Sequence, residues 1–315
     1  MEFFITTLIA VATMLVYAVP GYISVKAKLI KPESISAFAV VLMYVCSPCL
    51  TVYSVNAVPV YTKELIIQIV GFFFISMAAQ AIMLGLAFLI LRKKYDDVKY
   101  RVYTVATSFG NCAFMGVPLL QALFPDNPNV TILSVSYLLG MNIFGWTIGS
   151  AIITRDKKYI KPWKAIVNPA AIAMIICLPL FFTTWRLPEK VADIFTLLGK
   201  MSTPMCMLIM GMRLATVKPK SLFCTPSQYA IVFVKQMIFP FIGMLLIWFL
   251  PFEQYVKYSM FILCAAPVAS VVLNFAEMLG EGQENAANLV LLGTVFSVAT
   301  LPVMTLILQA IGGAA

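Results

Sequence analysis

The sequence contains no histidine, and few of its residues are charged. Of 315 residues, 11% are Asp, Glu, Lys or Arg, whereas 62% are hydrophobic. Without histidine, the common zinc sites and Ser-His-Asp triads cannot form, and the side chain best suited to moving protons near neutral pH is missing. No carboxylate lies deep within an apolar segment either. Both absences argue against an intramembrane enzyme and against proton coupling through a buried Asp or Glu.

The charge that is present does not form a basic patch. The net charge is +9, but the basic residues lie in short loops between apolar segments, so they indicate topology and not a nucleic-acid partner. Thiols in apolar surroundings are usually inert, so we expect no redox role for the pair Cys46-x-x-Cys49. The composition predicts an all-α polytopic protein of the cell membrane, surrounded by the lipid bilayer, with no metal or other cofactor.

Ten apolar segments are long enough to cross a bilayer with some tilt. They cover residues 3–25, 35–55, 65–91, 102–124, 130–153, 165–183, 191–213, 228–250, 256–278 and 286–310. The first is predicted to be a retained helix and not a signal peptide, because its lysines follow the apolar run. One side of the membrane receives the basic clusters at 26–31, 92–101, 155–164 and 213–220; the other receives only Lys63, Arg186, Lys190 and Lys257. This asymmetry predicts that both termini are extracytoplasmic.

The positions of the prolines favour two five-helix repeats. Pro48 in the second segment is echoed by Pro204 in the seventh, and Pro118 in the fourth by Pro267 in the ninth. A repeat with an odd number of helices is inverted in the membrane, which is typical of secondary transporters whose corresponding broken helices form the binding site. The predicted division is residues 1–153 for the first repeat, 154–164 for a cytoplasmic linker and 165–315 for the second repeat.

The stretch from Asn111 to Leu120 is predicted to interrupt the fourth helix. Gly116 and Pro118 favour unwinding, which membrane proteins tolerate only where protein or a water-filled cavity covers the opened backbone. The alternative is a proline kink packed by neighbouring helices. Broken antiparallel helices four and nine would cross near the midplane and direct the N-termini of their second halves at the crossing, which suits an anion. The polar side chains there would be Ser108, Asn111, Ser270 and Asn274.

These residues resemble a known family. Asn111-Cys112-Ala113-Phe114-Met115-Gly116-Val117-Pro118-Leu119-Leu120 resembles the fourth-helix crossover motif of the auxin efflux carrier family, which includes plant PIN-type carriers and bacterial carboxylate permeases. Ala265-Ala266-Pro267, with Asn274 downstream, resembles the ninth-helix crossover, and Thr300-Leu301-Pro302 the tenth-helix ending. Two further positions resemble the seventh and eighth helices of the family. They are Pro204 with Gly211 in the seventh segment and Lys235 before Pro240 in the eighth. The resemblance covers the whole chain.

The resemblance implies ten helices in two inverted repeats, with crossed fourth and ninth helices. It also implies elevator-type movement of a transport domain (helices 3–5 and 8–10) against a scaffold (helices 1, 2, 6 and 7), and substrates such as malate, malonate or indole-acetate. The crossover positions carry over to Asn111, Pro118 and Pro267. The ninth helix departs from the bacterial pattern, because Val271 and Val272 stand where a second polar residue often lies.

Few other polar residues fall within the apolar segments, and each is a candidate for function. Lys235 supplies positive potential to an anion cavity, pairs with a fixed dipole, or extends its ammonium to the cytoplasmic interface. Lys200 precedes Ser202-Thr203-Pro204 and is expected to be structural, in a wet scaffold cleft. Gln80 and Asn142 are either interhelical hydrogen-bonding groups or, with Asn111, ligands of a sodium ion.

The leading hypothesis is a secondary transporter of a small organic anion, such as a mono- or dicarboxylate. Asn111 would hydrogen-bond the carboxylate, while Gly116, Pro118 and Pro267 would hold the break open and Lys235, Ser270 and Asn274 would complete the site. A sodium-coupled symporter of related fold and a uniporter are the rivals within this class. The rival from another class is a membrane-embedded ligand sensor. Sodium or proton coupling and assembly as a homodimer are left open.

Overall fold

The computed structural model describes residues 2–156, 163, 166–217 and 225–312. Within these ranges the secondary structure is helical, apart from one isolated β-bridge. Most of the predicted linker at 154–164 lies outside the described residues. The same holds for several basic residues of the topology prediction: Lys157, Lys158, Lys161, Lys164, Lys218 and Lys220.

Among the described residues, seven helical stretches are long and apolar enough to cross a membrane. They are Glu2–Lys26, Pro32–Asn56, Lys63–Lys94, Val130–Thr154, Glu189–Thr216, Pro226–Trp248 and Gln283–Gly312. Two shorter apolar helices span Cys112–Leu123 and Pro169–Phe181. The prediction of an all-α protein with several membrane spans is therefore confirmed for the described part of the chain.

The α-helices of the first half are α1 (Glu2–Val16), α2 (Ala18–Lys26), α3 (Ile35–Val41), α4 (Ser47–Asn56), α5 (Lys63–Leu91), α6 (Val98–Ala106), α7 (Val117–Leu123), α8 (Val130–Phe144) and α9 (Ser150–Thr154). Those of the second half are α11 (Pro169–Cys177), α12 (Glu189–Lys200), α13 (Ser202–Thr216), α15 (Pro226–Phe233), α16 (Phe239–Trp248), α17 (Gln254–Ala265), α18 (Val271–Leu279) and α19 (Gln283–Gly312).

Local sequence signals explain several helix starts. Thr62 precedes α5, and its hydroxyl accepts a hydrogen bond from the Leu65 N–H at 3.2 Å. Asn168 does the same for α11 through the Ala170 N–H at 3.0 Å, and Pro169 follows it at the first helical position. Such caps satisfy backbone donors that have no partner within the helix.

Three prolines within the spans are each preceded by a π-helical turn. The turns η2 (Leu42–Cys46), η4 (Cys112–Gly116) and η8 (Val234–Ile238) end two residues before Pro48, Pro118 and Pro240, respectively. A proline removes one backbone donor and its ring collides with the carbonyl four residues earlier. A π turn lengthens the hydrogen-bonded loop by one residue, so the helix continues past the proline without breaking.

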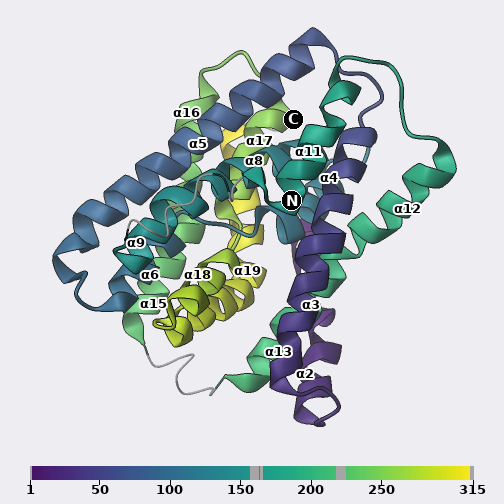
Figure 1. Ribbon diagram of the computed structural model, residues 1–315. Coiled ribbons are helices and arrows are strands. Elements are labelled where there is room, and N and C mark those ends of the chain that lie inside the picture. Colours follow the sequence, from purple (N-terminus) through teal and green to yellow (C-terminus); the bar gives the residue numbers. More distant parts are fainter. Residues whose placement is uncertain (1, 157–162, 164–165, 218–224, 313–315) are drawn as a thin grey trace.

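The helices form two groups (Figure 1). The first helix group consists of α2, α3, α4, α11, α12 and α13, in which α2 packs against α13, and α11 and α12 pack against α4. The second helix group consists of α5 to α9 and α15 to α19, in which α5 packs against α8 and α16. Helix α1 contacts both groups, through α13 of the first and through α7 and α19 of the second. This arrangement places an interface between the groups along α1, α7 and α13.

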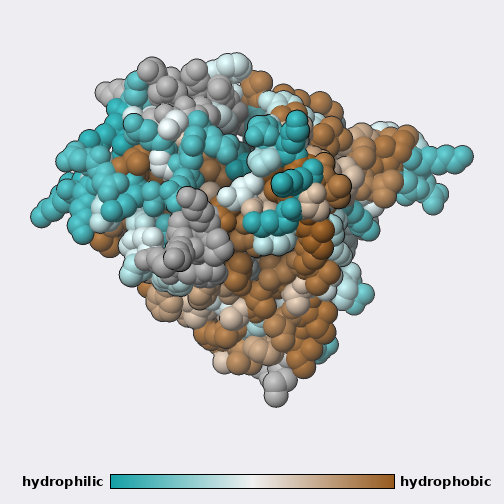
Figure 2. All heavy atoms as spheres, turned by 90° about the horizontal axis from the view of Figure 1, so that it is seen from below, coloured by the Kyte–Doolittle hydropathy of each residue, from teal (hydrophilic) through white to brown (hydrophobic). Residues whose placement is uncertain are grey.

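The surface has the apolar character of a membrane protein. Large hydrophobic side chains point outward along several helices, among them Ile9, Phe74, Ile90 and Phe249. Figure 2 shows hydrophilic residues gathered on the left of that view, the side on which α6 and α9 lie in Figure 1, and hydrophobic residues over much of its centre. Exposed apolar area of this extent is expected where lipid, and not water, surrounds the helices.

Candidate functional site

Two helix interruptions meet inside the second helix group. Gly110 and Val268 form an isolated antiparallel bridge, in which the Asn111 N–H donates to the Pro267 carbonyl at 2.7 Å and the Ala269 N–H donates to the Phe109 carbonyl at 3.0 Å. We call these two segments, 109–111 and 267–269, the paired break. Each segment satisfies backbone groups of the other, which is how non-helical backbone persists at membrane depth.

The first interruption lies earlier in the chain than the sequence predicts. The chain leaves the helical conformation between Thr107 and Asn111 and is helical again from Cys112 through Leu123. Pro118 does not break the helix because the π turn before it accommodates the ring, and because the Thr203 hydroxyl donates to the freed Phe114 carbonyl at 2.8 Å. The prediction of unwinding at Gly116 and Pro118 is therefore wrong in position, although Asn111 does stand at the end of a break.

Lys235 is a buried cation beside the paired break. Its side chain is 0% exposed, and its ammonium donates to the Cys264 carbonyl at 2.5 Å, in the last turn of α17. The same ammonium lies 4.9 Å from the centre of the Phe239 ring. A Cβ atom at Gly110 would lie 2.9 Å from it, so the ammonium packs directly against the backbone of Gly110. Lys235 therefore does not extend to the membrane surface. Its contact with a carbonyl at the C-terminal end of α17 matches the interpretation that it pairs with a fixed dipole.

One face of α13 runs along the paired break and its flanking helices. Four α13 side chains at helical spacing make the contacts: Thr203, Cys206, Met210 and Arg213. Their partners, in the same order, are the Phe114 carbonyl (2.8 Å), Asn111 Nδ2 (3.9 Å), Ser270 Oγ (4.0 Å) and Glu277 Oε1 (2.9 Å). Asn111 and Ser270, the predicted halves of the site, thus face the same helix of the first group.

The remaining predicted residues are distributed around this core. Pro267 belongs to the paired break itself, and Asn274 lies on α18 one turn beyond Ser270, on the side that carries Glu277. Gly116 serves close packing, since a Cβ there would lie 2.5 Å from a Leu263 methyl group. Ser108 donates to the backbone carbonyl of Gln80 at 3.0 Å and so ties the break to α5.

Two polar residues predicted as ion support make no side-chain hydrogen bond to the paired break among the described residues. Gln80 and Asn142 are both buried, but no side-chain hydrogen bond of either one joins it to residues 109–111 or 267–269 in the described structure. Both atoms of the Gln80 side-chain amide are without a partner among the described residues. The described residues also contain no cluster of three His, Cys, Asp or Glu side chains that would hold a metal ion.

A cavity of about 300 Å³ lies between the two helix groups, next to Pro118. Its polar lining consists of Thr13, Tyr17, Tyr53, Gln121, Lys200 and Thr203. Gln121 on α7 donates to the Tyr53 hydroxyl at 2.8 Å, and the Lys200 ammonium lies 5.7 Å from the centre of the Tyr53 ring. The sequence identified Pro118, Lys200 and Thr203 separately, but nothing in it placed them around one space.

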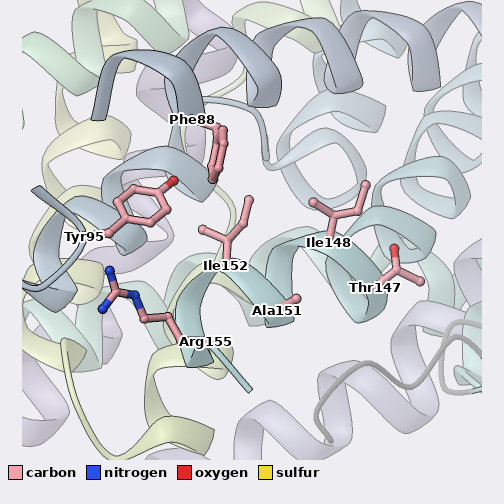
Figure 3. A pocket seen from close by; sticks show the side chains of 7 residues that line it. All are labelled: Phe88, Tyr95, Thr147, Ile148, Ala151, Ile152 and Arg155. Atoms are coloured by element: carbon pink, nitrogen blue, oxygen red, sulfur yellow. The ribbon is translucent and has the colours of Figure 1, made fainter. Parts of the chain in front are cut away.

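A second cavity, of about 360 Å³, has a different character (Figure 3). Figure 3 shows Phe88, Tyr95, Ile148 and Ile152 around it, with Arg155 at one end. Arg155 is already paired with Asp96 at 3.0 Å, so its charge is not directed at a ligand. The first cavity and the paired break are therefore the better candidates for an anion site.

Apolar helices of membrane-spanning length, with interrupted helices paired inside the protein, define a multi-pass α-helical membrane protein. The chain belongs to the family described as Membrane transport protein, the auxin efflux carrier family, whose family model matches residues 6–305. It is accordingly a membrane transporter. A comparison with curated proteins gave no match.

Proposed function

We propose that the protein is a secondary transporter of a small organic anion, which binds where the paired break faces α13. The observation that carries this proposal is the buried Lys235 ammonium, held beside two helix interruptions whose polar side chains Asn111 and Ser270 face α13. Among the described residues no carboxylate forms an ion pair with this ammonium, and the Cys264 carbonyl at the end of α17 offers only a partial negative charge. An anionic substrate supplies the missing negative charge.

The residues have separate roles in this proposal. Asn111 donates a hydrogen bond from Nδ2 to a carboxylate oxygen, because its present acceptor is only a sulfur 3.9 Å away. Lys235 provides the positive potential. The N-termini of the helices that begin at Cys112 and Val271 add to this potential, since both start at the paired break. These groups favour a carboxylate over a neutral ligand.

The weakness of two contacts between α13 and the second helix group supports a proposal of movement between the groups. Two of the four α13 contacts end on sulfur, which is a weak acceptor and gives little energy at 3.9 Å and 4.0 Å. We propose that the first helix group, with α1, is a scaffold and that the second helix group carries the substrate across the membrane in an elevator-type movement. The full arrangement of ten helices in two inverted repeats, with both termini extracytoplasmic in the cell membrane, is part of this proposal.

Truncation of Asn111 tests the binding role. In proteoliposomes loaded for uptake of a radiolabelled carboxylate, Asn111→Ala is expected to raise the KM by roughly 10- to 100-fold, as for loss of one hydrogen bond to a charged group. Asn288→Ala is the control, because it removes an equally buried amide from α19. Unchanged KM and rate for Asn111→Ala would exclude Asn111 from the site.

Sodium dependence separates this proposal from the sodium-coupled alternative. Sodium sites need carboxylates or several converging carbonyl oxygens, and at the paired break the Cys264 carbonyl already accepts a hydrogen bond from Lys235. We expect carboxylate uptake to proceed at the same rate when choline replaces sodium on both sides of the liposome membrane. Uptake that requires an inward sodium gradient would contradict this expectation and favour the symporter.

A further inference from the structure

We propose that the cavity of about 300 Å³ beside Pro118 is a second binding site, which takes a small monocarboxylate with an apolar body. It is separate from the paired break, because none of the residues 109–111 or 267–269 lines it. The inference rests on the proposed function to the extent that the ligand is taken to be the transported anion. The substrate would then occupy this cavity before or after it binds at the paired break.

Lys200 provides the charge for a carboxylate. It stands at the C-terminal end of α12, its side chain is exposed, and no carboxylate of the described residues lies within salt-bridge distance of its ammonium. The neighbouring aromatic face of Tyr53, 5.7 Å away, orients the ammonium without neutralising it. A lysine so placed is free to pair with an anion that enters the cavity.

Tyr53 and Gln121 provide a directed hydrogen bond. The Tyr53 hydroxyl accepts a hydrogen bond from Gln121 Nε2 at 2.8 Å, so its own proton remains available to a second oxygen. Gln121 belongs to α7 in the second helix group, whereas Tyr53 and Lys200 belong to α4 and α12 in the first. A carboxylate held by Lys200 and Tyr53 is therefore linked to the second helix group through the hydrogen bond between Tyr53 and Gln121.

The rest of the lining selects the body of the ligand. Ala10, Met14, Leu50 and Val117 present apolar surface, and the single cation matches one carboxylate better than two. A volume of about 300 Å³ is at the small end of ligand sites, which suits a molecule the size of benzoate. Thr203 lines the cavity, and its hydroxyl also donates to the Phe114 carbonyl. Phe114 belongs to the helix that begins at the paired break, so Thr203 connects the cavity with that helix.

The test detects the positive charge of the cavity from the rates at which charged reagents label an introduced thiol, and it does not depend on transport. Thr13 lines the cavity and is exposed, and the six cysteines of the described residues are buried, so Thr13→Cys adds an accessible thiol among the described residues. Cys224, which lies outside the described residues, is replaced by serine in both the parent protein and the variant. Labelling rates are compared for a negatively and a positively charged methanethiosulfonate reagent, with the parent protein as background. Lys200→Gln is expected to lower the ratio of negative to positive labelling by about fivefold, the effect of one charge near water. Lys190→Gln, on the same helix but outside the cavity, is expected to leave the ratio unchanged.

Protection by benzoate then tests binding. Benzoate is expected to slow the labelling of Thr13→Cys when Lys200 is present and to have no effect in the Lys200→Gln background. An unchanged labelling ratio in Lys200→Gln, or equal protection in both backgrounds, would overturn the second site. If the wild type transports no carboxylate while benzoate still protects Thr13→Cys through Lys200, the proposed function fails and the second site stands. If uptake depends on Asn111 but benzoate gives no protection, only the second site fails.

Discussion

Replacement of Lys235 by methionine is expected to reduce anion uptake to the level of empty liposomes, a loss of roughly 100-fold or more, while the protein stays folded. Methionine fills a similar unbranched volume, so the packing around the paired break is retained. What is lost is the positive charge beside Asn111 and Gly110. Because burial of a charge in an apolar environment opposes folding, we expect the melting temperature of Lys235→Met in detergent to equal or exceed that of the wild type.

The chain offers a closely matched control for this substitution. Lys257 also donates from its ammonium to a carbonyl at the end of a helix, that of Trp248 at 2.9 Å, and it also lies near an aromatic ring. It differs from Lys235 in being only half-buried and in contacting Trp248 instead of residues beside the paired break. Lys257→Met is therefore expected to retain uptake. A loss of uptake in both variants would show that lysine contacts with helix ends matter to the fold, and not that Lys235 matters to the substrate.

A second variant separates charge from hydrogen bonding at the same position. Lys235→Gln keeps a donor for the Cys264 carbonyl but removes the charge. We expect it to be as inactive as Lys235→Met. Uptake near the wild-type rate in Lys235→Gln would mean that only the hydrogen bond is needed, and would remove the electrostatic argument for an anionic substrate at the paired break.

The existence of two broken helices could be predicted from the sequence, but the position of the first could not. Pro267 lies in the break that it marks, where its carbonyl accepts a hydrogen bond from the Asn111 N–H and its missing backbone donor is not needed. Pro118 does not, because a π turn and the Thr203 hydroxyl accommodate it. The real break centres on Gly110, whose conformation is stabilised by hydrogen bonds between its segment and that of Val268. That partner is remote in sequence, so no local pattern indicates it.

The contacts made by one face of α13 could not be predicted from the sequence either, because their partners are also remote in sequence. Thr203 and Cys206 belong to a segment whose only sequence signal is its similarity to the proline region of the second apolar segment. Met210 carries no such signal. Their role depends on which helix lies opposite them, and that is set by tertiary packing. Lys235 is the converse case: its residue type alone marked it as a candidate, since a lysine within an apolar segment is rare. A functional candidate could therefore be predicted from its residue type, whereas the helix that packs against it could not.

The packing of α13 leads to a prediction about stability, because it approaches α2 through two glycines. A Cβ atom at Gly211 would overlap the backbone carbonyl of Ala18, and one at Gly21 would overlap the carbonyl of Leu208. Small residues at helix contacts let backbones approach closely, which is a main source of helix association in membranes. Gly211→Ala is therefore expected to destabilise the first helix group by about 3 kcal/mol or more, since backbone atoms cannot turn away as a side chain can.

The measurement is the thermal unfolding of purified Gly211→Ala in detergent, compared with Gly85→Ala. Gly85 lies within α5, and no atom would lie within 4 Å of a Cβ added there. Alanine favours a helix over glycine by up to about 1 kcal/mol, so Gly85→Ala is expected to melt at or above the wild-type temperature. Equal melting temperatures for the two variants would mean that α2 and α13 separate at little cost. The first helix group could then not be the rigid body against which the second one moves, and the elevator proposal would lose its scaffold.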